Sequence, residues 1–470
     1  MNINDKDINQ IYRIPLNDSK TLQMLASGNT DGIFQLESGG MRKTLMQLKT
    51  NSFIDIVDAI ALYRPGPMEM IPTFVNRKLN KEEIVYPHQD LEGILKPTYG
   101  IIVYQEQILQ IASLFAGYSL GEADILRRAV SKKKVDELKQ QEEKFIQGAI
   151  KKGYKKEVAK NIFDLILKFA NYGFNKSHSV AYSYISYQMA YLKTHYYKEF
   201  MAVLMSYSIG RTNAIKNYIM ECNQNKVEVM LPSVNYSSSN FNIVNGKIYY
   251  SLMGINGLGE VVVNEIVKER TQNGLYQSYD DFIARTKGFL NRKVVEALIY
   301  AGACDEFKIT RKAMIEEYEQ SLELANFGGL FKDQLVNHQF SDEEFTFEVI
   351  ANFERFALGF NFKFDIFKQY GYLKKKFRTT DICKLVPGKK AFVMFMVDRI
   401  KVIKTKKGEE MVFLNVSDDT SPIDATCFPK TYAMYKNSIA IGKICVAECN
   451  VENRDEKIKI VIEKMFFQDK

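Results

Sequence analysis

The hydrophobic residues of this chain change their spacing along the sequence, and this change limits the fold more than any other feature. Before about residue 210, apolar residues recur at helical spacing, as at Tyr104, Ile108, Ile111 and Phe115. From about residue 386 onward, the apolar runs are short, continuous or alternating, and separated by turns. Around five such strands within about 80 residues favour a small barrel of the oligonucleotide-binding (OB) type. We therefore predict a multidomain α+β protein, helical at first and ending in a five-stranded OB-type barrel.

Two regions of different character lie between these ends. Residues 212–310 contain an Asn245-Gly246 hairpin signal between short apolar runs, followed by two short helical units. Residues 311–385 are helical at first and then mixed, which indicates a connector.

The composition excludes several classes of protein without selecting a function. With 46% apolar and 26% charged residues, the chain has the composition of a soluble globular protein. It lacks an apolar run of about 18 residues, and its polar start is unlike a signal peptide, so we expect no membrane contact and a cytoplasmic location. The net charge of +8 is mild, so the placement of the cations matters more than their number.

The cysteines and histidines do not form a metal-binding or disulfide pattern. The sequence has no CxxC pair and four histidines, so we expect no metal site in this chain. We expect all six cysteines to be small, reduced core residues. They are Cys222, Cys304, Cys383, Cys427, Cys445 and Cys449.

Two helices can be placed from local signals. Ser119 with Glu122 three residues later forms a capping box that predicts a helix start. A later helix within 180–200 is predicted to present one apolar face, formed by Ala181, Ile185, Met189 and Leu192.

Three glycines in LMGINGLGEVVVNEI form the strongest local signal. Gly254, Gly257 and Gly259 sit in a six-residue turn directly before a helix. Glycine permits positive φ, and bare N–H groups at a helix start can cradle a phosphate. The spacing is typical of a helix-hairpin-helix motif that grips a duplex backbone. The alternative is an ordinary glycine-rich connector.

Cations cluster at 126–134, at a helix and its end. Charge of this density would suit a triphosphate or a nucleic-acid backbone, and Leu126 and Ala129 would orient the two arginines in a common direction. The alternative is a solvated basic helix face. The cations are Arg127, Arg128, Lys132, Lys133 and Lys134.

The segment YGFNKSHSVAY predicts a helix start with basic side chains beside it. Asn175 or Ser177 can cap the helix, and Lys176 and His178 lie at its mouth, which favours an anion. The alternative is a structural junction with a surface lysine and a buried histidine.

Two arginines lie next to unusual backbone segments. Arg42 follows Gly39 and Gly40, whereas Arg64 precedes Pro65-Gly66-Pro67 and is held in an extended turn. Such an arginine is a good phosphate clamp, or equally the cap of a structural turn.

The strand-rich end combines cations with aromatic residues. Basic rims and aromatic platforms suit single-stranded nucleic acid, although most of Phe395, Phe413 and Phe428 are expected in the core. The cations are Arg399, Lys401, Lys404, Lys406 and Lys407.

Taken together, these motifs resemble the bacterial DNA polymerase III alpha family. LMGINGLG resembles the duplex-binding domain of that family, and the last 80 or so residues resemble its OB domain. The resemblance covers nearly the whole chain. Its fingers-domain segments are, in family order, DGIFQLESGGMR, ALYRPGPME, TYGIIVYQEQ, AGYSLGEADILRRAVSKKK and YGFNKSHSVAYSYISYQMAYLKTHY.

The resemblance implies roles for individual residues. Gly257 and Gly259 would contact the duplex backbone. Residues implied to hold the triphosphate of an incoming dNTP, or to lie close by, are Arg127, Arg128, Lys176 and His178. Residues implied to line the nucleotide and template pocket, or to contact the nucleotide or primer end, are Arg42, Arg64, Tyr172 and Asn175.

The resemblance also implies a domain organisation and an activity. The activity is DNA-templated DNA synthesis, with primer-template DNA, a sliding clamp and other replisome subunits as partners. The implied domains are 1–30, end of palm or linker; 31–211, fingers; 212–310, helix-hairpin-helix duplex binding; 311–385, connector with a candidate clamp-binding segment; and 386–470, OB domain.

Three departures from the family pattern qualify these expectations. Val130-Ser131 replaces the usual Met-Gly after the two arginines. In FGGLF, Phe327 replaces the glutamine of a clamp-binding motif, which counts against clamp binding although Leu330 and Phe331 remain.

The third departure concerns the metal centre. Nucleotidyl transfer needs carboxylates that hold two Mg²⁺ ions, and the family carries them in a palm that precedes the part matched here. Asp418-Asp419 is interpreted as a turn. We therefore expect this chain alone to be inactive. Two alternatives stay open: a stand-alone, noncatalytic nucleic-acid-binding protein, and the damage-tolerant branch of the same family.

Overall fold

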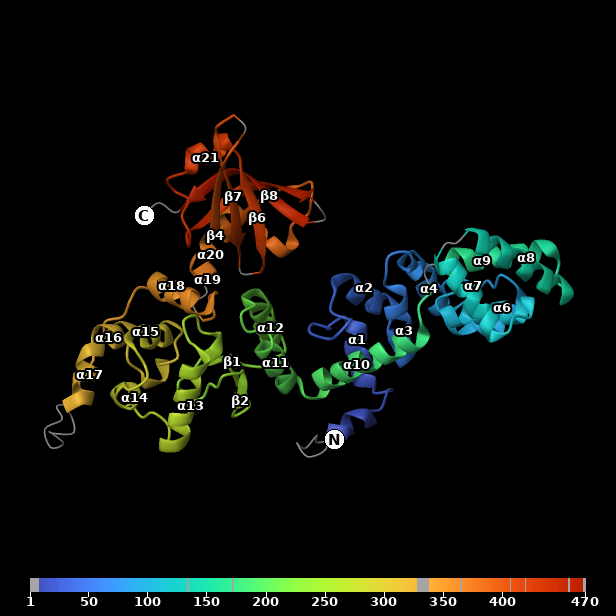
Figure 1. Ribbon diagram of the computed structural model, residues 1–470. Coiled ribbons are helices and arrows are strands. Elements are labelled where there is room, and N and C mark those ends of the chain that lie inside the picture. Colours follow the sequence, from blue (N-terminus) through green and yellow to red (C-terminus); the bar gives the residue numbers. More distant parts are fainter. Residues whose placement is uncertain are drawn as a thin grey trace. The chain divides into compact units, whose positions relative to one another are not determined.

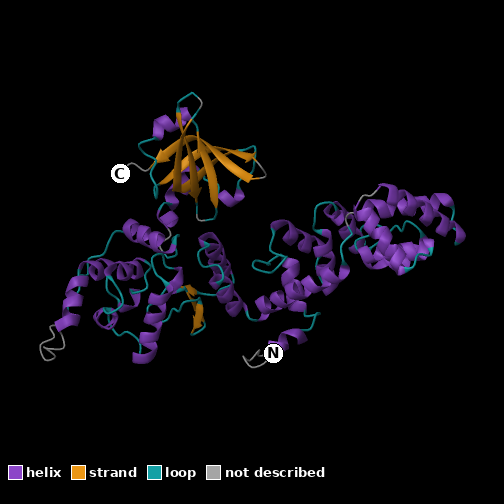
Figure 2. Cartoon of the chain, viewed as in Figure 1, coloured by secondary structure: helices purple, strands orange, loops and turns teal. Residues whose placement is uncertain are grey.

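The chain divides into two compact units, Met1–Leu204 and Met205–Lys470 (Figure 1). A computed structural model describes residues 8–132, 135–170, 173–327, 338–363, 366–405, 407–418, 420–454 and 457–467. Figure 2 shows that helices dominate both units and that most strands belong to one barrel. The finer division into five domains that the sequence suggests stays a prediction.

The first unit is helical throughout its described residues. Short 3₁₀ turns, η1 (Ile8–Arg13) to η4 (Lys96–Thr98), lie between some of the helices. The helices are α1 (Ser19–Ser27), α2 (Gly39–Leu48), α3 (Phe53–Leu62), α4 (Ile71–Lys78), α5 (Glu92–Leu95), α6 (Gln105–Ala116), α7 (Leu120–Lys132), α8 (Val135–Lys151), α9 (Lys156–Ala170), α10 (Lys176–His195) and α11 (Tyr197–Ser206), which continues into the second unit.

Two hydrophobic cores support this unit. One is built from α1 to α4 and α10, and the other from α6 to α9 with the segment before α6. The four positions that predicted a helix at 104–115 are all buried, with Tyr104 capping α6 and the other three within it. The predicted capping box at the start of α7 is confirmed, because the Ser119 amide donates to Glu122 (2.8 Å) and the Glu122 amide donates to the Ser119 hydroxyl (3.3 Å).

The predicted apolar face of α10 is wrong. Ala181 and Ile185 are exposed, and the helix instead buries three serines together with Tyr187 and Ala190. The Ser179 hydroxyl donates to the Val57 carbonyl (2.7 Å), and the Ser186 hydroxyl donates to the Phe34 carbonyl (2.8 Å). Small hydroxyl side chains let α10 pack closely on the neighbouring backbone and donate hydrogen bonds to the carbonyl groups of that backbone. The serines are therefore buried on this face in place of the larger apolar residues.

The second unit begins with helices and a small sheet. Strands β1 (Val229–Met230), β2 (Asn242–Val244) and β3 (Lys247–Tyr249) form that sheet, in the order β1-β3-β2. The predicted hairpin is confirmed, since Asn245 and Gly246 join β2 to β3 with φ of 50° and 77°. The helices are α12 (Thr212–Gln224), α13 (Glu260–Asn273), α14 (Tyr279–Thr286), α15 (Arg292–Tyr300), α16 (Arg311–Glu316), α17 (Tyr318–Phe327), α18 (Phe347–Leu358), α19 (Ile366–Gln369), α20 (Gly371–Phe377) and α21 (Pro429–Tyr435).

A closed five-stranded barrel ends the chain, as the alternating runs predict. Its strand order is β4-β5-β6-β8-β7, and the parallel pairing of β6 with β8 closes it. The alternating residues Ile423, Ala425 and Cys427 point into its core. The strands are β4 (Lys390–Lys404), β5 (Glu410–Ser417), β6 (Pro422–Cys427), β7 (Ile444–Arg454) and β8 (Lys457–Phe467).

Two expectations about buried residues need correction. Five cysteines are buried, but Cys383 is exposed, because it lies in a short 3₁₀ turn before the barrel rather than in a strand or core helix. Of the three phenylalanines expected mainly in the core, only Phe395 is buried. Phe413 and Phe428 are 42% and 44% exposed. Phe413 lies on β5 between the buried Val412 and Leu414, and Phe428 follows β6 as the N-cap of α21.

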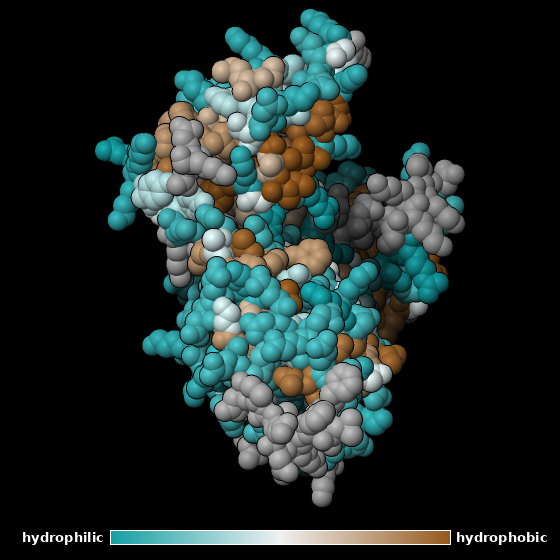
Figure 3. All heavy atoms as spheres, turned by 90° about the vertical axis from the view of Figure 1, so that its left-hand side faces the viewer, coloured by the Kyte–Doolittle hydropathy of each residue, from teal (hydrophilic) through white to brown (hydrophobic). Residues whose placement is uncertain are grey.

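Figure 3 shows one face of the molecule, which is mostly hydrophilic, with hydrophobic side chains gathered in several patches. Among the described residues, no helix has the length and hydropathy needed to cross a bilayer.

Candidate nucleotide and DNA interface

Arg127 and Arg128 share one carboxylate on α7. Arg127 donates to Asp124 through Nε (2.9 Å) and Nη2 (2.7 Å), and Arg128 Nε lies 2.8 Å from the other carboxylate oxygen. The two arginines therefore point in a common direction, as predicted from the buried Leu126 and Ala129 on the opposite side of the helix. The hydrogen bonds from Arg127 lower the pKa of Asp124, which keeps the carboxylate charged.

Gln105 connects these arginines to the segment that precedes α10. Arg127 Nη1 donates to Gln105 Oε1 (3.3 Å), and Gln105 Nε2 donates to the Gly173 carbonyl (3.1 Å). The Gln105 amide also donates to the Phe174 carbonyl (2.9 Å). Segments separated by about 70 residues in the sequence thus meet through one glutamine side chain and its backbone.

A carboxylate already occupies the start of α10. The Lys176 amide donates to both oxygens of Glu106 (3.1 Å each), and Asn175 Nδ2 donates to Glu106 Oε1 (3.0 Å). Asn175 is the N-cap, because its side-chain oxygen accepts from the His178 amide (2.8 Å). The start of α10 therefore holds a negatively charged group, and that group is Glu106 of the same chain.

The basic side chains beside this helix start are exposed and face aromatic rings. Lys176 Nζ lies 5.3 Å from the centre of the Tyr104 ring. The His178 ring lies 5.4 Å from Phe174 and 4.2 Å from Tyr182. Because His178 is exposed, the alternative of a buried structural histidine does not hold.

Arg64 reaches the same segment from the end of α3. Its guanidinium lies 4.3 Å from the centre of the Phe174 ring, and its Nε donates to the Ala61 carbonyl (3.0 Å). Burial lowers the pKa of Arg64. Gly66 has a φ of 98°, which only glycine adopts readily, and the Met68 amide donates to the Arg64 carbonyl (3.1 Å), so a tight turn follows Arg64.

Arg42 is brought close to this region by its helix rather than by its own side chain. An added Cβ on Gly40 would lie 1.9 Å from the Tyr63 hydroxyl, so glycine lets α2 pack against the residue that precedes Arg64. The Arg42 guanidinium pairs with Asp31 and donates to the Glu37 carbonyl (2.8 Å). Among the described residues, no hydrogen bond or ion pair joins Arg42 to Arg64, Arg127 or Lys176.

Tyr104 is hydrogen-bonded to a buried carboxyl group that the sequence did not lead us to predict. The Tyr104 hydroxyl donates to Asp58 Oδ1 on α3, where Asp58 is 2% exposed. Burial raises the pKa of Asp58 to about 7. The neighbouring Asp55 differs, because Lys78 forms a 2.6 Å ion pair with it. An Asp-x-x-Asp spacing inside an apolar helix was the available signal.

The three glycines of the predicted hairpin have different structural reasons. Only Gly257 has a positive φ (93°); Gly254 instead leaves room for the Tyr250 ring, which an added Cβ would approach to 2.5 Å. Gly259 has an ordinary φ of −98° and is the N-cap of α13. An added Cβ on Gly257 or Gly259 would meet nothing within 4 Å.

The hairpin presents open backbone groups. Within the described residues, the amides of Gly257 and Gly259 make no hydrogen bond, whereas the Asn256 amide donates to the Ala357 carbonyl (2.8 Å). A backbone phosphate of DNA can bind where there is open space and where amide groups are free to donate. Both conditions are met directly before α13, a helix of 14 residues.

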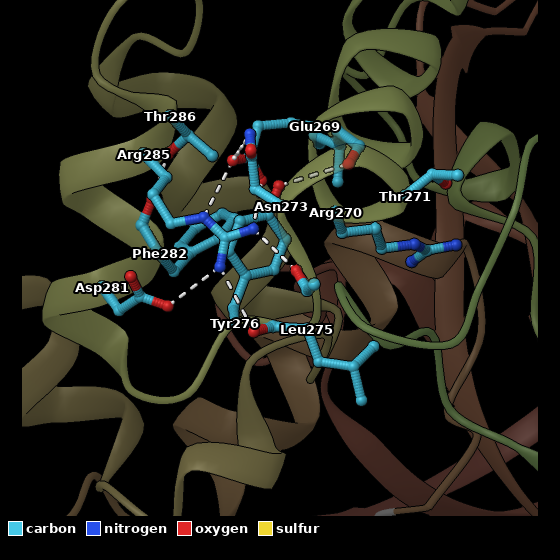
Figure 4. Close-up of polar contacts among 12 residues, drawn as sticks. Glu269, Arg270, Thr271, Asn273, Leu275, Tyr276, Asp281, Phe282, Arg285 and Thr286 are labelled. Carbon is cyan, nitrogen blue, oxygen red and sulfur yellow. Dashed lines mark hydrogen bonds and ion pairs between the residues drawn. The ribbon is translucent and has the colours of Figure 1, made fainter.

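A cluster of hydrogen bonds and ion pairs centred on Arg285 joins α13, the helix that follows this hairpin, to α14. Arg285 of α14 donates to both oxygens of Glu269 on α13 (2.8 and 2.7 Å) and to Asp281 (3.1 Å), and lies 4.4 Å from the Tyr276 ring centre (Figure 4). Burial alone would raise the pKa of Glu269, but hydrogen bonds from Arg285 and Asn273 outweigh it and lower this pKa.

The remaining predicted cations are only partly described. Arg399, Lys401 and Lys404 are exposed on β4, and Lys407 is exposed in the following turn. Asp418 accepts from the Thr420 and Ser421 amides (2.7 and 2.8 Å), which confirms its place in a turn. Predicted site residues outside the described backbone or side chains are Lys132, Lys133, Lys134, Tyr172, Leu330, Phe331 and Lys406.

The described residues contain no group of three or more His, Cys, Asp or Glu side chains placed to hold a metal ion. The arrangement in the first unit can bind an anion through arginine and helix-start donors, and that in the second can approach a phosphate backbone.

Comparisons with known proteins give three domain matches. Residues 2–153 match the finger domain of the bacterial DNA polymerase III alpha subunit. Residues 226–314 match a helix-hairpin-helix motif, and residues 396–467 match an OB-fold nucleic acid binding domain. Among solved structures, RecG bound to a three-way DNA junction shares 14% identity at a TM-score of 0.17, over 46% of this chain and 29% of that one, which is too slight to support an argument.

Curated relatives match almost the entire chain. The DNA polymerase III subunit alpha of Halalkalibacterium halodurans is 42% identical over 97% of this chain, and that of Bacillus subtilis is 39% identical over 96%. The corresponding subunit of Borreliella burgdorferi is 37% identical over 97%. This chain spans 42% of the length of each of these three relatives. With its finger, helix-hairpin-helix and OB-fold matches in the order found along the sequence, the chain belongs to the bacterial DNA polymerase III alpha subunit family.

Proposed function

We propose that this chain supplies the nucleotide-positioning and DNA-gripping part of a DNA-directed DNA polymerase that acts in chromosomal replication. The observation that carries the proposal is the pair of arginines on Asp124, joined through Gln105 to the capped start of α10. Arg128 shares Asp124 with Arg127, and Arg127 is linked through Gln105 to the segment that leads into α10, so these donors form one connected site that suits the triphosphate of a dNTP.

When a triphosphate binds, its phosphate oxygens would replace the carboxylates of Asp124 and Glu106 as the partners of these donors. Asp124 and Glu106 hold these donors in place before the nucleotide arrives, so the donors need little reorganisation when it does. Arg64 and Asn175 would then contact the nucleotide or primer end, with Arg42 at the template side.

The metal ions of the reaction would be held elsewhere. We propose that palm aspartates outside this sequence bind Mg²⁺ and supply charge stabilisation at the reacting phosphoryl group. The residues of this chain would orient the substrate and neutralise charge on its phosphates.

The other segments would hold DNA and partners. We propose fingers at 31–211, a duplex grip at 212–310 centred on Gly257 and Gly259, and a barrel at 386–470 that takes single-stranded template. Sliding-clamp contact in the connector rests on sequence alone, and other replisome subunits are proposed on the same basis.

The decisive experiment is steady-state primer extension with Mg²⁺, using the full chain together with a palm-containing protein of the same family. Arg127→Ala with Arg128→Ala should raise the KM for dNTP by about 100-fold, since two charge-assisted phosphate contacts are lost. The matched control is Lys155→Ala with Lys156→Ala, two adjacent exposed lysines at the start of α9, which should leave KM unchanged.

Three results are informative. An unchanged KM in the arginine variant would refute the triphosphate role. Extension by the full chain without the palm protein would refute the proposed location of the metal site. DNA binding without extension in any mixture would favour the stand-alone binding protein.

A further inference from the structure

A cavity of about 1160 Å³ in the second unit is lined by both α12 and the barrel. One wall comes from α12, with Asn213, Lys216 and Met220, and the other from β4 and β5, with Lys401 and Phe413. The end of α18 and the residues after it, 359–363, complete the lining. Its volume exceeds the ~300–1,000 Å³ of typical small-molecule pockets, which favours an extended ligand.

Direct contacts join the elements that line the cavity. Arg355 of α18 forms a 2.6 Å ion pair with Asp398 on β4. Lys216 Nζ of α12 donates to the Asp418 backbone carbonyl after β5 (3.3 Å). The Lys216 bond therefore joins α12 to the barrel, and the Arg355 pair joins α18 to it.

The charge that remains in the cavity is positive. Six cationic side chains line it against three carboxylates. Two of those carboxylates are already satisfied: Asp398 by Arg355, and Asp418 by backbone amides, including that of Ile382 (2.7 Å). Lys216 bonds a carbonyl rather than a carboxylate, and Lys401 makes no hydrogen bond or ion pair with another described residue.

Groups that recognise bases stand beside these cations. Phe413 is 42% exposed on β5 and is the register partner of Lys401 on β4, so both side chains leave the same face of the sheet. Amide side chains of Asn213, Asn223 and Asn415 also line the cavity. Cations along two walls with an exposed ring between them match the requirements of a single-stranded nucleic acid, whose phosphates need charge and whose bases need stacking surfaces.

We propose that α12 is the second wall of a groove for single-stranded DNA, which passes between α12 and the β4–β5 face of the barrel. The proposal deepens the proposed function, because it rests on the barrel taking single-stranded template. It adds α12, which no domain match includes, as a direct contact through Lys216 and Met220.

The test uses the full chain and a fluorescein-labelled dT oligonucleotide of about 12 residues, followed by anisotropy over a salt series. Lys216→Ala and Lys401→Ala should each weaken binding by roughly three- to tenfold and reduce the salt slope by about 0.7. Lys216→Arg should restore binding. The matched control is Lys430→Ala on α21, exposed and outside the cavity, which should bind as the unchanged chain does.

Photocrosslinking with 4-thiothymidine in the same oligonucleotide separates direct contact from an effect on folding. Crosslinks should appear in peptides of both α12 and β5, and crosslinks confined to the barrel would overturn the proposal. It is also overturned if Lys216→Ala binds as the unchanged chain does while Lys401→Ala is weakened, a result that leaves the proposed function intact. Absence of any dT binding refutes the single-strand role of the barrel and the groove with it, and tighter binding of an rU oligonucleotide refutes the assignment to DNA.

Discussion

Replacing the buried Asp58 by asparagine should stabilise the first unit, and more strongly as the pH rises. Asp58 lies in the middle of α3 with only 2% of its surface exposed, and its partner is the neutral hydroxyl of Tyr104. Burial is the largest cause of its raised pKa. The hydrogen bond from Tyr104 lowers this pKa, Asp55 raises it further, and Lys176 and Lys78 lower it, but burial outweighs the lowering contributions. An ionised Asp58 is therefore poorly compensated.

The expected magnitude follows from the pKa of about 7 against an ordinary value of 3.8. Because the pKa is higher in the folded state, the folded chain binds the extra proton between about pH 4 and pH 7, so stability falls as the pH rises through this window. Three pKa units correspond to about 4 kcal/mol, of which about 3 kcal/mol develops between about pH 4.5 and pH 8. Asparagine does not ionise, and its side-chain oxygen can still accept from Tyr104.

Amide hydrogen exchange of α3 peptides measures this effect locally, which matters in a chain with two units. The free energy of opening of Asp58→Asn, minus that of the unchanged chain, should grow by about 3 kcal/mol between about pH 4.5 and pH 8. The matched control is Asp55→Asn on the same helix, which removes the buried ion pair with Lys78 and should destabilise by about 3 kcal/mol. A difference for Asp58→Asn that does not change with pH would refute the reasoning.

Three further predictions concern packing, an ion pair and thiol access. Gly148→Ala should destabilise the α6–α9 core by about 2 kcal/mol in urea unfolding, because the new Cβ would lie 2.2 Å from the Ala116 carbonyl oxygen; an unchanged midpoint would show that the helices can separate freely. Arg285→Met should cost about 2 kcal/mol at neutral pH by amide exchange of α13, since Glu269 loses a half-buried, charged hydrogen-bond partner. Glu269 has a lowered pKa in the folded chain, so its contribution to the free energy of unfolding is present above about pH 4.5 and is lost as the pH falls through the folded pKa. The loss of stability in Arg285→Met should therefore become smaller in acid. A loss that does not change with pH would contradict the ion-pair explanation. Under native conditions a thiol reagent should modify Cys383 quickly and the five buried cysteines only on unfolding, so rapid reaction of two or more thiols would contradict the burial pattern.

The elements that the sequence predicts well are those whose signals are local. The Asn245-Gly246 hairpin needs only two residues with positive φ, and the alternating Ile423, Ala425 and Cys427 need only one buried face. Capping of α7 by Ser119 depends on residues three apart. In each case the deciding interaction lies within a few residues, so one sequence contains all of it.

The face of α10 could not be found in the same way. Hydrophobic periodicity assumes that the largest apolar residues are buried, but Ser179 and Ser186 are buried because they complete hydrogen bonds to carbonyls 122 and 152 residues away. A rule based on the side chains of one helix contains no information about the backbone on which that helix packs.

The two carboxylates of the candidate site differ in the same way, because one has partners nearby in the sequence and the other does not. Asp124 stands three and four residues before Arg127 and Arg128, a spacing that already indicates ion pairing on one helix. Glu106 gave no such signal, because its partner, the start of α10, follows 70 residues later. The cations alone suggested a triphosphate or a nucleic-acid backbone at 126–134 and an anion at the start of α10. With Asp124 and Glu106 in place, an incoming anion must compete with two carboxylates of the chain itself, so a triphosphate, which carries several charges, gains far more from this site than a single phosphate or chloride does.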